Sequence, residues 1–205
     1  MQDSKLAELA KMVEAWPGLV SRPARELIED SLVLLDHLET ARRLVDVGSG
    51  GGLPGLPLKI ARPELSVTLV EADQAKAAFL VQACASLGLS GVEVVARRAE
   101  EVGQDDGYRE AFDVAVARAL APMRTLVELC LPLVSVGGRL LAQKTEKEDL
   151  DPALRAIALL GGALRSVEAG PSSLRRGGTV VIVDKVRSTP AMYPRRPGMP
   201  ARKPL

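Results

Sequence analysis

Aromatic residues are scarce in this chain: one Trp, two Tyr and two Phe make up 2% of its 205 residues. A surface that stacks several unpaired bases on aromatic rings is therefore not expected, so any recognition of RNA would rest on charge and shape. His37 is the only histidine, so no protein-held zinc site is expected, and we interpret His37 as a helix-surface residue. The two cysteines, Cys84 and Cys130, lie far apart in apolar helical patterns. This spacing argues against a disulfide framework and indicates two buried free thiols.

Long apolar runs are also missing, because no stretch reaches the roughly 18 consecutive apolar residues of a membrane span. The first residues, MQDSKLAELAK, are polar and amphipathic rather than signal-like. We therefore expect a cytoplasmic protein that makes no membrane contact. A hydrophobic content of 47% indicates one globular domain with a full core, and we expect a monomer without a protein partner.

Helical and strand periods alternate along the chain, which predicts an α/β fold. Apolar residues recur at helical spacing over residues 4–15 and 24–38, which we expect to form an N-terminal helical lead-in. Short Val- and Leu-rich runs then alternate with helices, as in a doubly wound parallel sheet covered on both faces. Residues 161–185 contain no helical pattern and are compatible with an antiparallel final hairpin. The expected strands are 44–47, 67–70, 92–95, 113–116, 139–142 and 179–183, and the expected helices between them are 54–61, 74–87, 122–133 and 150–160.

The chain is thus divided into a helical lead-in (1–40), a central domain (41–187) and a C-terminal arm (188–205). From residue 185 onward the sequence has no acidic residue, six basic ones and five prolines, so a helix or a central strand is not expected there. Two interpretations of this basic arm stay open. It is a solvated tail, or it is an extended strap along a phosphate backbone.

Residues 44–58, LVDVGSGGGLPGLPL, run from an apolar strand into five glycines and two prolines. Ligands of doubly wound sheets bind at the carboxyl ends of the strands, and glycines there let a cofactor pack against main-chain atoms. Gly50, Gly52 and Gly55 match G-x-G-x-x-G, so a dinucleotide such as NAD has to be weighed against S-adenosylmethionine.

Two features of this loop favour S-adenosylmethionine. Asp46 lies two residues before Gly48, where a carboxylate can face a cofactor that carries an ammonium and a sulfonium but would sit awkwardly beside a pyrophosphate. Gly48, Gly50 and Gly52 also form a G-x-G-x-G turn, after which residues 53–54 are expected to start a helix.

The ends of later strands add further candidates. Glu71 follows the second strand at about the 20-residue spacing of a ribose-binding carboxylate, a role common to both cofactors. After the third strand, Ala99 and Glu100 border an adenine ring, or Glu100 only charges the first turn of a helix; both interpretations stay open. Arg118 follows the fourth strand, where a methyl acceptor would approach. Lys144, with Gln143, ends the fifth strand at the same edge.

At this point the chain resembles a known family. The segments VDVGSGGGLPGLPLKIARPELSVTLVEA, KAAFL, RAEE, ARALAPM, GGRLLAQK and YPRRPGMPARKPL resemble the bacterial 16S ribosomal RNA methyltransferase G family, over roughly residues 27–205. The resemblance implies a Rossmann-like class I S-adenosylmethionine-dependent methyltransferase sheet with N-terminal helices. It also implies methyl transfer to N7 of a guanine in the 530 loop of 16S rRNA, acting on the RNA or on the small ribosomal subunit.

The strand ends, the basic arm and the resemblance together give expected roles for individual residues. Arg118 is the expected catalytic residue. The expected cofactor-binding residues are Asp46, Gly48, Ser49, Gly50, Gly52, Leu53, Glu71, Ala99, Glu100 and Arg118. The expected RNA-binding residues are Lys76, Arg98, Lys144, Arg195 and Arg196. The sequence departs from the family pattern at Leu27, where a histidine is usual, at Ala75, where a basic residue is usual, and at Thr145, where a glycine is usual.

No catalytic base is needed for such a reaction, because guanine N7 has an available lone pair and positioning is the main contribution. Two other classes of function are carried as alternatives. An NAD-dependent oxidoreductase would need a proton-relay residue, and neither Tyr108 nor Tyr193 lies in a recognisable arrangement for one. A non-catalytic RNA- or ribosome-binding protein could share the same fold.

Overall fold

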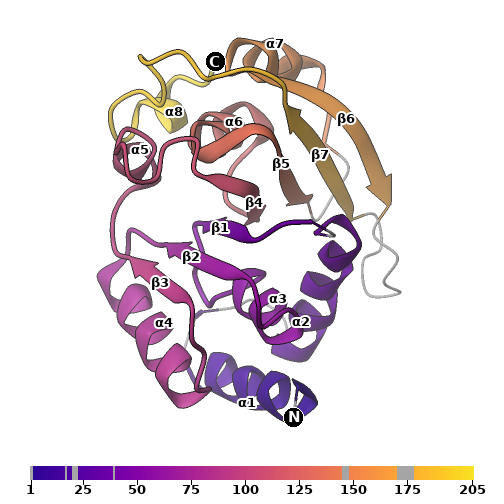
Figure 1. The fold of residues 1–205 in the computed structure, drawn as a ribbon, viewed down its shortest axis with the longest axis vertical. Coiled ribbons are helices and arrows are strands. Elements are labelled where there is room, and N and C mark those ends of the chain that lie inside the picture. The colour runs from indigo at the N-terminus through magenta and orange to yellow at the C-terminus, as the bar shows by residue number, and fades with distance from the viewer. Residues whose placement is uncertain (1, 17, 20–22, 39, 145–147, 170–177) are drawn as a thin grey trace.

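A computed structural model describes residues 2–16, 18–19, 23–38, 40–144, 148–169 and 178–205. These residues form three layers, with helices on both faces of a twisted sheet (Figure 1). The strands are β1 (Arg43–Val47), β2 (Ser66–Val70), β3 (Val92–Val95), β4 (Phe112–Arg118), β5 (Val134–Lys144), β6 (Gly162–Ala169) and β7 (Thr179–Lys185). The α-helices are α1 (Gln2–Ala15), α2 (Ala24–Leu32), α3 (Gly55–Ala61), α4 (Gln74–Ser86), α5 (Ala99–Val102), α6 (Met123–Cys130), α7 (Asp151–Leu159) and α8 (Met199–Arg202). Two 3₁₀ helices, η1 (Val33–His37) and η2 (Leu131–Leu133), complete the elements.

The sheet has the order β3-β2-β1-β4-β5-β7-β6. Strands β1 to β5 are parallel, and β7 runs antiparallel to both β5 and β6. The predicted doubly wound sheet and its antiparallel final hairpin are therefore confirmed. The strand order reverses between β1 and β4, because β2 and β3 follow on one side of β1 and β5 follows on the other side of β4. The loops after β1 and β4 therefore lead away from each other and open a crevice at the carboxyl edge.

Each face of the sheet has its own apolar core. Helices α1 to α4 cover one face, where Leu44 and Val116 point, and helices α5 to α7 cover the other, where Val45 and Ala117 point. All four of these strand residues are completely buried. This alternation explains the continuous Val- and Leu-rich strands, since a parallel sheet buried on both faces needs apolar residues at every position.

Several predicted details differ in the structure. The α-helix over 24–38 ends at Leu32 and continues as η1; the Ser31 hydroxyl donates to the Leu27 carbonyl (2.6 Å), a bond that competes with helix geometry. His37 lies in η1, where it is half-buried, and its Nε2 lies 3.4 Å from Glu168 Oε2. Cys130 is a buried free thiol as predicted, whereas Cys84 is only half-buried.

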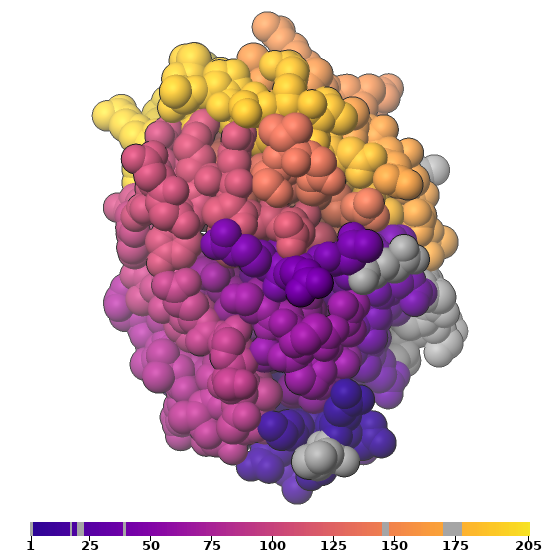
Figure 2. Space-filling model, viewed as in Figure 1, coloured from indigo at the N-terminus to yellow at the C-terminus, as the bar shows by residue number. Residues whose placement is uncertain are grey.

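The C-terminal arm folds back onto the domain instead of extending from it. Figure 2 shows this segment, in yellow, lying against the pink and orange surface of the central domain. In Figure 1, α8 lies beside α5 and α6. The expectation that no helix forms there was wrong. Pro200 is accommodated in α8 because the first helical turn needs no internal N–H partner.

Within the described ranges, no helix combines the length and the apolar character that a membrane crossing demands.

Candidate functional site

A cavity of about 400 Å³ opens where β1, β2 and β4 end. This volume is within the range of pockets that enclose small cofactors. Its lining is mostly small or apolar and includes six charged side chains. The lining residues are Val47, Gly48, Gly50, Val70, Glu71, Ala72, Lys76, Arg97, Arg98, Ala99, Glu100, Arg118, Ala119, Leu120, Ala121, Thr125, Leu129, Gly198, Pro200 and Ala201.

The glycine loop after β1 forms the floor of this cavity. Gly48 and Gly50 have φ angles of +73° and +53°, a region that favours glycine. A Cβ atom on Gly48 would lie 2.5 Å from Leu120 Cδ1, so Gly48 also lets the loop approach the segment after β4. The Gly48 N–H donates to the Val70 carbonyl (2.9 Å), which fixes the loop to the end of β2. A side chain at Gly48 would therefore intrude between the two walls.

Glu71 lies at the end of β2 and faces both the cavity and the loop. Its Oε2 accepts a hydrogen bond from the Gly50 N–H (2.8 Å), and its Oε1 accepts one from the Asp73 N–H (2.8 Å). The side chain is 9% exposed, and this exposed part lines the cavity. Each carboxylate oxygen keeps a further lone pair, so Glu71 can accept from a ligand hydroxyl while it holds the loop.

The prediction that Asp46 faces the cofactor was wrong, because its side chain points away from the cavity. Its side chain is completely buried beneath the glycine loop, and its Oδ2 accepts from the Gly55 N–H (2.8 Å) at the start of α3. Burial raises the pKa of Asp46 to about 7; the Gly55 hydrogen bond and the nearby Arg118 act in the opposite direction. Asp46 therefore orders the loop from below.

Three other predicted cofactor residues, Ser49, Gly52 and Leu53, do not line the cavity. The Ser49 hydroxyl donates to the Asp46 carbonyl (2.9 Å), and a Cβ on Gly52 would lie 2.4 Å from Leu56 Cδ1. Leu53 is 3% exposed and belongs to the apolar core on the α3 face. Because the turn is tight, only alternate backbone positions reach the cavity.

The structure separates the two roles that the sequence left open after β3. Glu101, not Glu100, closes the first turn of α5, where its Oε2 accepts from the Arg98 N–H (3.2 Å). Glu100 and Ala99 line the cavity, and Glu100 Oε1 accepts from the Gly198 N–H (2.9 Å) of the arm. The small side chain of Ala99 leaves space within the cavity, and Glu100 connects the arm to the cavity wall.

Arg118 ends β4 and lies between the cavity and α2. Its Nη1 donates to the Leu27 carbonyl (3.2 Å), so the residue that replaces the usual histidine contributes its backbone to hold this arginine. The next residue, Ala119, has a φ of +50°, a conformation that non-glycine residues rarely adopt and that is common at functional sites. The chain thus turns abruptly where β4 delivers Arg118.

The predicted RNA-binding residues divide into two groups. Lys76 and Arg98 line the cavity rim, and Arg196 is exposed on the arm. Lys144 is instead buried, with its Nζ 2.7 Å from the Ala121 carbonyl and 2.6 Å from Glu148 Oε2. The Arg195 guanidinium forms a two-pronged pair with Glu128, at 2.8 and 2.5 Å.

Lys144 and Arg195 are therefore corrected to structural roles, because their donors already hold neighbouring segments. Thr145 lies outside the described residues.

A second cavity, of about 580 Å³, lies where β4 and β5 begin, beside η1 and β6. It is larger than the cavity at the carboxyl edge, and several of its charged side chains have partners within the protein. Arg165 lies 3.2 Å from Asp184, and Asp113 Oδ2 accepts from the Arg42 and Arg43 N–H groups at 2.8 and 2.9 Å. Since ligands of doubly wound sheets bind at the carboxyl ends of the strands, we assign the smaller cavity as the functional site.

The sequence reasoning missed the part of the wall that comes from α6 and the arm. Thr125 and Leu129 of α6 line the cavity, and so do three residues of the arm: Gly198, Pro200 and Ala201. One signal was present in the sequence: Glu128 interrupts the apolar run TLVELCLPL, and an acid on such a face indicates a buried cationic partner.

Solved structures of methyltransferases share this fold. Geranyl diphosphate methyltransferase in complex with S-adenosylmethionine aligns with a TM-score of 0.62 and 17% identity, covering 83% of this chain and 93% of that one. A 1,6-didemethyltoxoflavin-N1-methyltransferase from Burkholderia thailandensis, with bound S-adenosylhomocysteine, aligns with a TM-score of 0.58 and 15% identity over 91% of this chain and 87% of that one. The sheet therefore has the Rossmann-like fold that these methyltransferases share.

Sequence comparison then gives the family. The sequence model of the protein family described as rRNA small subunit methyltransferase G matches residues 18–173. The ribosomal RNA small subunit methyltransferase G of Moorella thermoacetica is 47% identical over 188 residues, which cover 88% of this chain and 78% of that protein. The enzyme of the same name from Roseiflexus castenholzii is 48% identical over 184 residues, with the same coverage. The chain belongs to the rRNA small subunit methyltransferase G family.

Proposed function

We propose that this chain transfers the methyl group of S-adenosylmethionine to N7 of a guanine in the 530 loop of 16S rRNA. The observation that carries the proposal is the 400 Å³ cavity at the carboxyl edge, which brings the glycine loop, Glu71 and Arg118 together in a member of this family. Nothing in the site favours the alternative of a nicotinamide enzyme. Tyr108, one of the two tyrosines, donates its hydroxyl to Glu93 (2.6 Å) and does not line this cavity.

The residues of the cavity suit S-adenosylmethionine by shape and charge. The main-chain surface of Gly48 and Gly50 accepts a closely packed ligand, and Glu71 offers oxygens to ribose hydroxyls. Ala99 leaves space for a base. When bound, S-adenosylmethionine supplies a methyl group on a positively charged sulfur. Of the six charged side chains in the lining, Glu71 and Glu100 are the two acidic ones, so these are the groups that can face the positively charged sulfur.

The chain has to position the acceptor rather than to remove a proton. Guanine N7 carries a free lone pair, and transfer from sulfur to N7 leaves no proton to be abstracted, so the transition state asks for alignment. Arg118 lies at the cavity edge, held by the Leu27 carbonyl. Its guanidinium can contact the O6 edge of the guanine or a phosphate next to it.

The rim of the cavity supplies the remaining contacts to RNA in this proposal. Lys76 and Arg98 lie at the mouth, and Arg196 extends exposed positive charge along the arm. Contacts of this kind bind phosphates without reading the sequence. Lys144 and Arg195 are left out of the RNA surface because their donors are occupied within the protein.

The test is methyl transfer to a defined acceptor. Labelled S-adenosylmethionine is incubated with the protein and either unmodified small ribosomal subunits or deproteinised 16S rRNA, and the product is mapped by primer extension after cleavage specific for N7-methylguanine. We expect label at one guanine of the 530 loop, and the better of the two acceptors identifies the substrate form. Label at another position, or tight cofactor binding without transfer to either acceptor, would contradict the proposal.

A further inference from the structure

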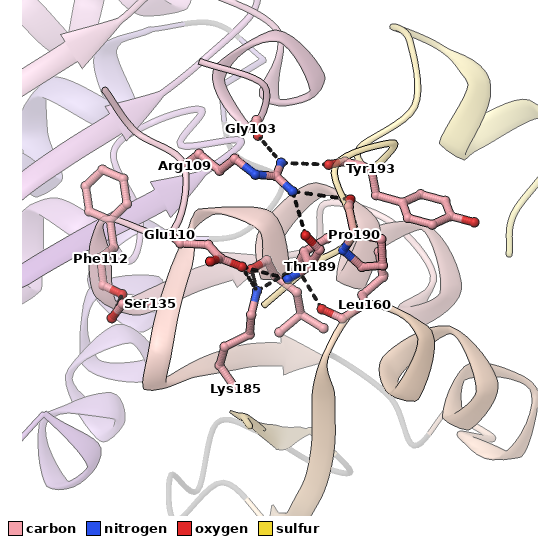
Figure 3. Close-up of polar contacts among 11 residues, drawn as sticks. Gly103, Arg109, Glu110, Phe112, Ser135, Leu160, Lys185, Thr189, Pro190 and Tyr193 are labelled. Atoms are coloured by element: carbon pink, nitrogen blue, oxygen red, sulfur yellow. Dashed lines mark hydrogen bonds and ion pairs between the residues drawn. The ribbon is translucent and has the colours of Figure 1, made fainter. Parts of the chain in front are cut away.

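The C-terminal arm is attached to the domain by a polar cluster at its beginning, drawn in Figure 3. Arg109 donates to the carbonyls of Thr189 (2.8 Å), Pro190 (3.2 Å) and Tyr193 (2.7 Å), and also to that of Gly103 (2.8 Å). One side chain therefore binds three carbonyls of the arm and one of the loop after α5. This arrangement fixes the direction in which the arm leaves the sheet.

A second part of the cluster lies beneath the first. The completely buried Lys185 side chain donates to Thr189 Oγ1 (2.6 Å) and lies 3.1 Å from Glu110 Oε1. Glu110 Oε1 also accepts from the Thr189 N–H (2.7 Å). A buried lysine is stable only when it is paired and hydrogen-bonded, so this group holds the arm with little freedom.

A further anchor holds the distal part of the arm. Glu128 of α6 is completely buried and accepts from both the guanidinium and the backbone N–H of Arg195. The Thr125 hydroxyl donates to the Pro200 carbonyl (3.1 Å), and the Gln104 side chain donates to the Pro194 carbonyl (2.8 Å). The arm is thus attached to α6 and to the loop after α5.

These anchors place the end of the arm at the cavity itself. Gly198, Pro200 and Ala201 line it, and the Gly198 N–H donates to Glu100 Oε1 (2.9 Å). This part of the wall is uncharged and small, whereas the arginines of the arm point to Glu128 or to solvent. An apolar wall of this kind suits the flat face of a purine better than a phosphate.

We propose that residues 198–201 of the C-terminal arm form part of the S-adenosylmethionine site, with Arg195 as their positioning residue through its pair with Glu128. The arm lies beyond residues 18–173 matched by the family model, so this assigns a cofactor-binding role outside the matched stretch. The inference rests on the proposed function of the cavity. It replaces the expected RNA strap with a wall of the cofactor site.

The test compares two substitutions on the same arm. Ala201 is exposed and lines the cavity, so Ala201→Trp introduces a large side chain into it; Ala191→Trp makes the same change at an exposed position outside the lining. Binding of S-adenosylhomocysteine is measured by calorimetry for the wild type and both variants, and thermal unfolding confirms that they are folded. We expect Ala201→Trp to weaken binding at least about 10-fold and Ala191→Trp to change it less than about 2-fold. If Ala201→Trp does not fold, Ala201→Leu takes its place with the same expectation of weaker binding.

Different results separate the two proposals. Wild-type affinity in Ala201→Trp would overturn the role of the arm while leaving the cavity as the cofactor site. Absence of binding by the wild type would overturn the proposed function, and the role of the arm with it. If Ala201→Trp increased the KM for RNA without any change in S-adenosylhomocysteine affinity, the role of the arm in cofactor binding would also be overturned. That result would show that the arm binds RNA instead.

Arg195→Lys tests the positioning role. Lysine keeps the charge beside Glu128 but cannot form the two-pronged pair. We expect the KM for S-adenosylmethionine to rise several-fold while kcat at saturating cofactor stays near the wild-type value. An equal loss of kcat, or an unchanged KM, would overturn a positioning role for Arg195.

Discussion

Strand β4 has a cavity at each end, and the two cavities differ in both volume and lining. The cavity at its beginning measures about 580 Å³ and is lined by Asp36, Arg139 and Arg165 among others. The cavity at its end measures about 400 Å³ and is lined by glycines, alanines and Arg118. Both cavities contain charged side chains; in the larger one, Arg165 is paired with Asp184, and Asp113 accepts from two backbone N–H groups.

The difference shows that the number of chain segments that meet at a cavity identifies the functional site better than the volume of the cavity does. At the carboxyl edge, the loops after β1, β2, β3 and β4 all meet, together with the arm. Each loop contributes a different chemistry, and positive φ angles at Gly48 and Gly50 let main-chain atoms approach a ligand closely. At the opposite edge the strands begin, and their side chains mainly stabilise the fold.

The largest expected effect comes from the arginine at the carboxyl end of β4. We expect Arg118→Ala to lower kcat for methyl transfer by about 100- to 1,000-fold, the usual loss for one positioned donor, and to change S-adenosylhomocysteine affinity less than about 5-fold. The matched control is Arg139→Ala at the other cavity, which should leave both quantities near wild type. Unchanged turnover in Arg118→Ala, measured with a folded protein, would remove this arginine from the mechanism.

The next effect compares two glycines that both have positive φ angles. In Gly48→Ala the new Cβ would lie 2.5 Å from Leu120 Cδ1, whereas a Cβ on Gly137, with φ +93°, has no atom within 4 Å. Both variants lose roughly 1 kcal/mol of stability from backbone strain. Only Gly48→Ala should also weaken S-adenosylhomocysteine binding, by about 30-fold, as measured by calorimetry. Equal affinities of the two variants for S-adenosylhomocysteine would contradict the assignment of the cofactor site to the cavity beside Gly48.

A third effect is expected on stability rather than on ligand binding, and it depends on pH. The raised pKa of Asp46, about 7 in the folded state against an ordinary 3.8, means that the folded protein binds more protons than the unfolded chain between these values. The free energy of unfolding contributed by Asp46 therefore falls as the pH rises from about 4 to 7.

In Asp46→Asn this loss disappears, while an amide oxygen still accepts from the Gly55 N–H. We expect the variant to gain stability relative to the wild type as the pH increases, reaching up to about 4 kcal/mol at pH 8. Urea unfolding at pH 5, 6, 7 and 8 measures the difference. A constant difference across this range would show that Asp46 titrates normally.

The smallest effects are expected at the rim. Removing one phosphate contact in Lys76→Ala or Arg98→Ala should raise the Kd for RNA several-fold and reduce the slope of log Kd against log salt by about 1. Arg165→Ala removes a cation from the other cavity and should do neither. If Arg165→Ala weakened RNA binding as much as the rim variants, the RNA surface would extend to the wrong end of β4.

Much of the fold was predictable because its signals are local. The Val- and Leu-rich runs at β1, β2 and β4 identify buried parallel strands, and the glycine loop marks the edge at which ligands bind. The same local pattern placed Gly48, Gly50, Glu71, Ala99, Glu100 and Arg118, all of which line the cavity.

What could not be predicted depends on contacts between distant segments. Asp46 follows the strand pattern of a cofactor contact, but whether its carboxylate turns outward or beneath the loop is decided by the Gly55 N–H. Arg195 has the composition of an RNA contact, and only the fold brings it to Glu128. A basic arm and a buried acid 67 positions apart carry no local sign that they pair.

The measurement that tests the central claim most directly is a crystal structure of the protein with S-adenosylhomocysteine. We predict that the ligand occupies the 400 Å³ cavity, with its ribose next to Glu71 and its base between Ala99 and residues 198–201. Ligand bound in the 580 Å³ cavity beside Arg139 would contradict the assignment of the functional site to the carboxyl end of β4.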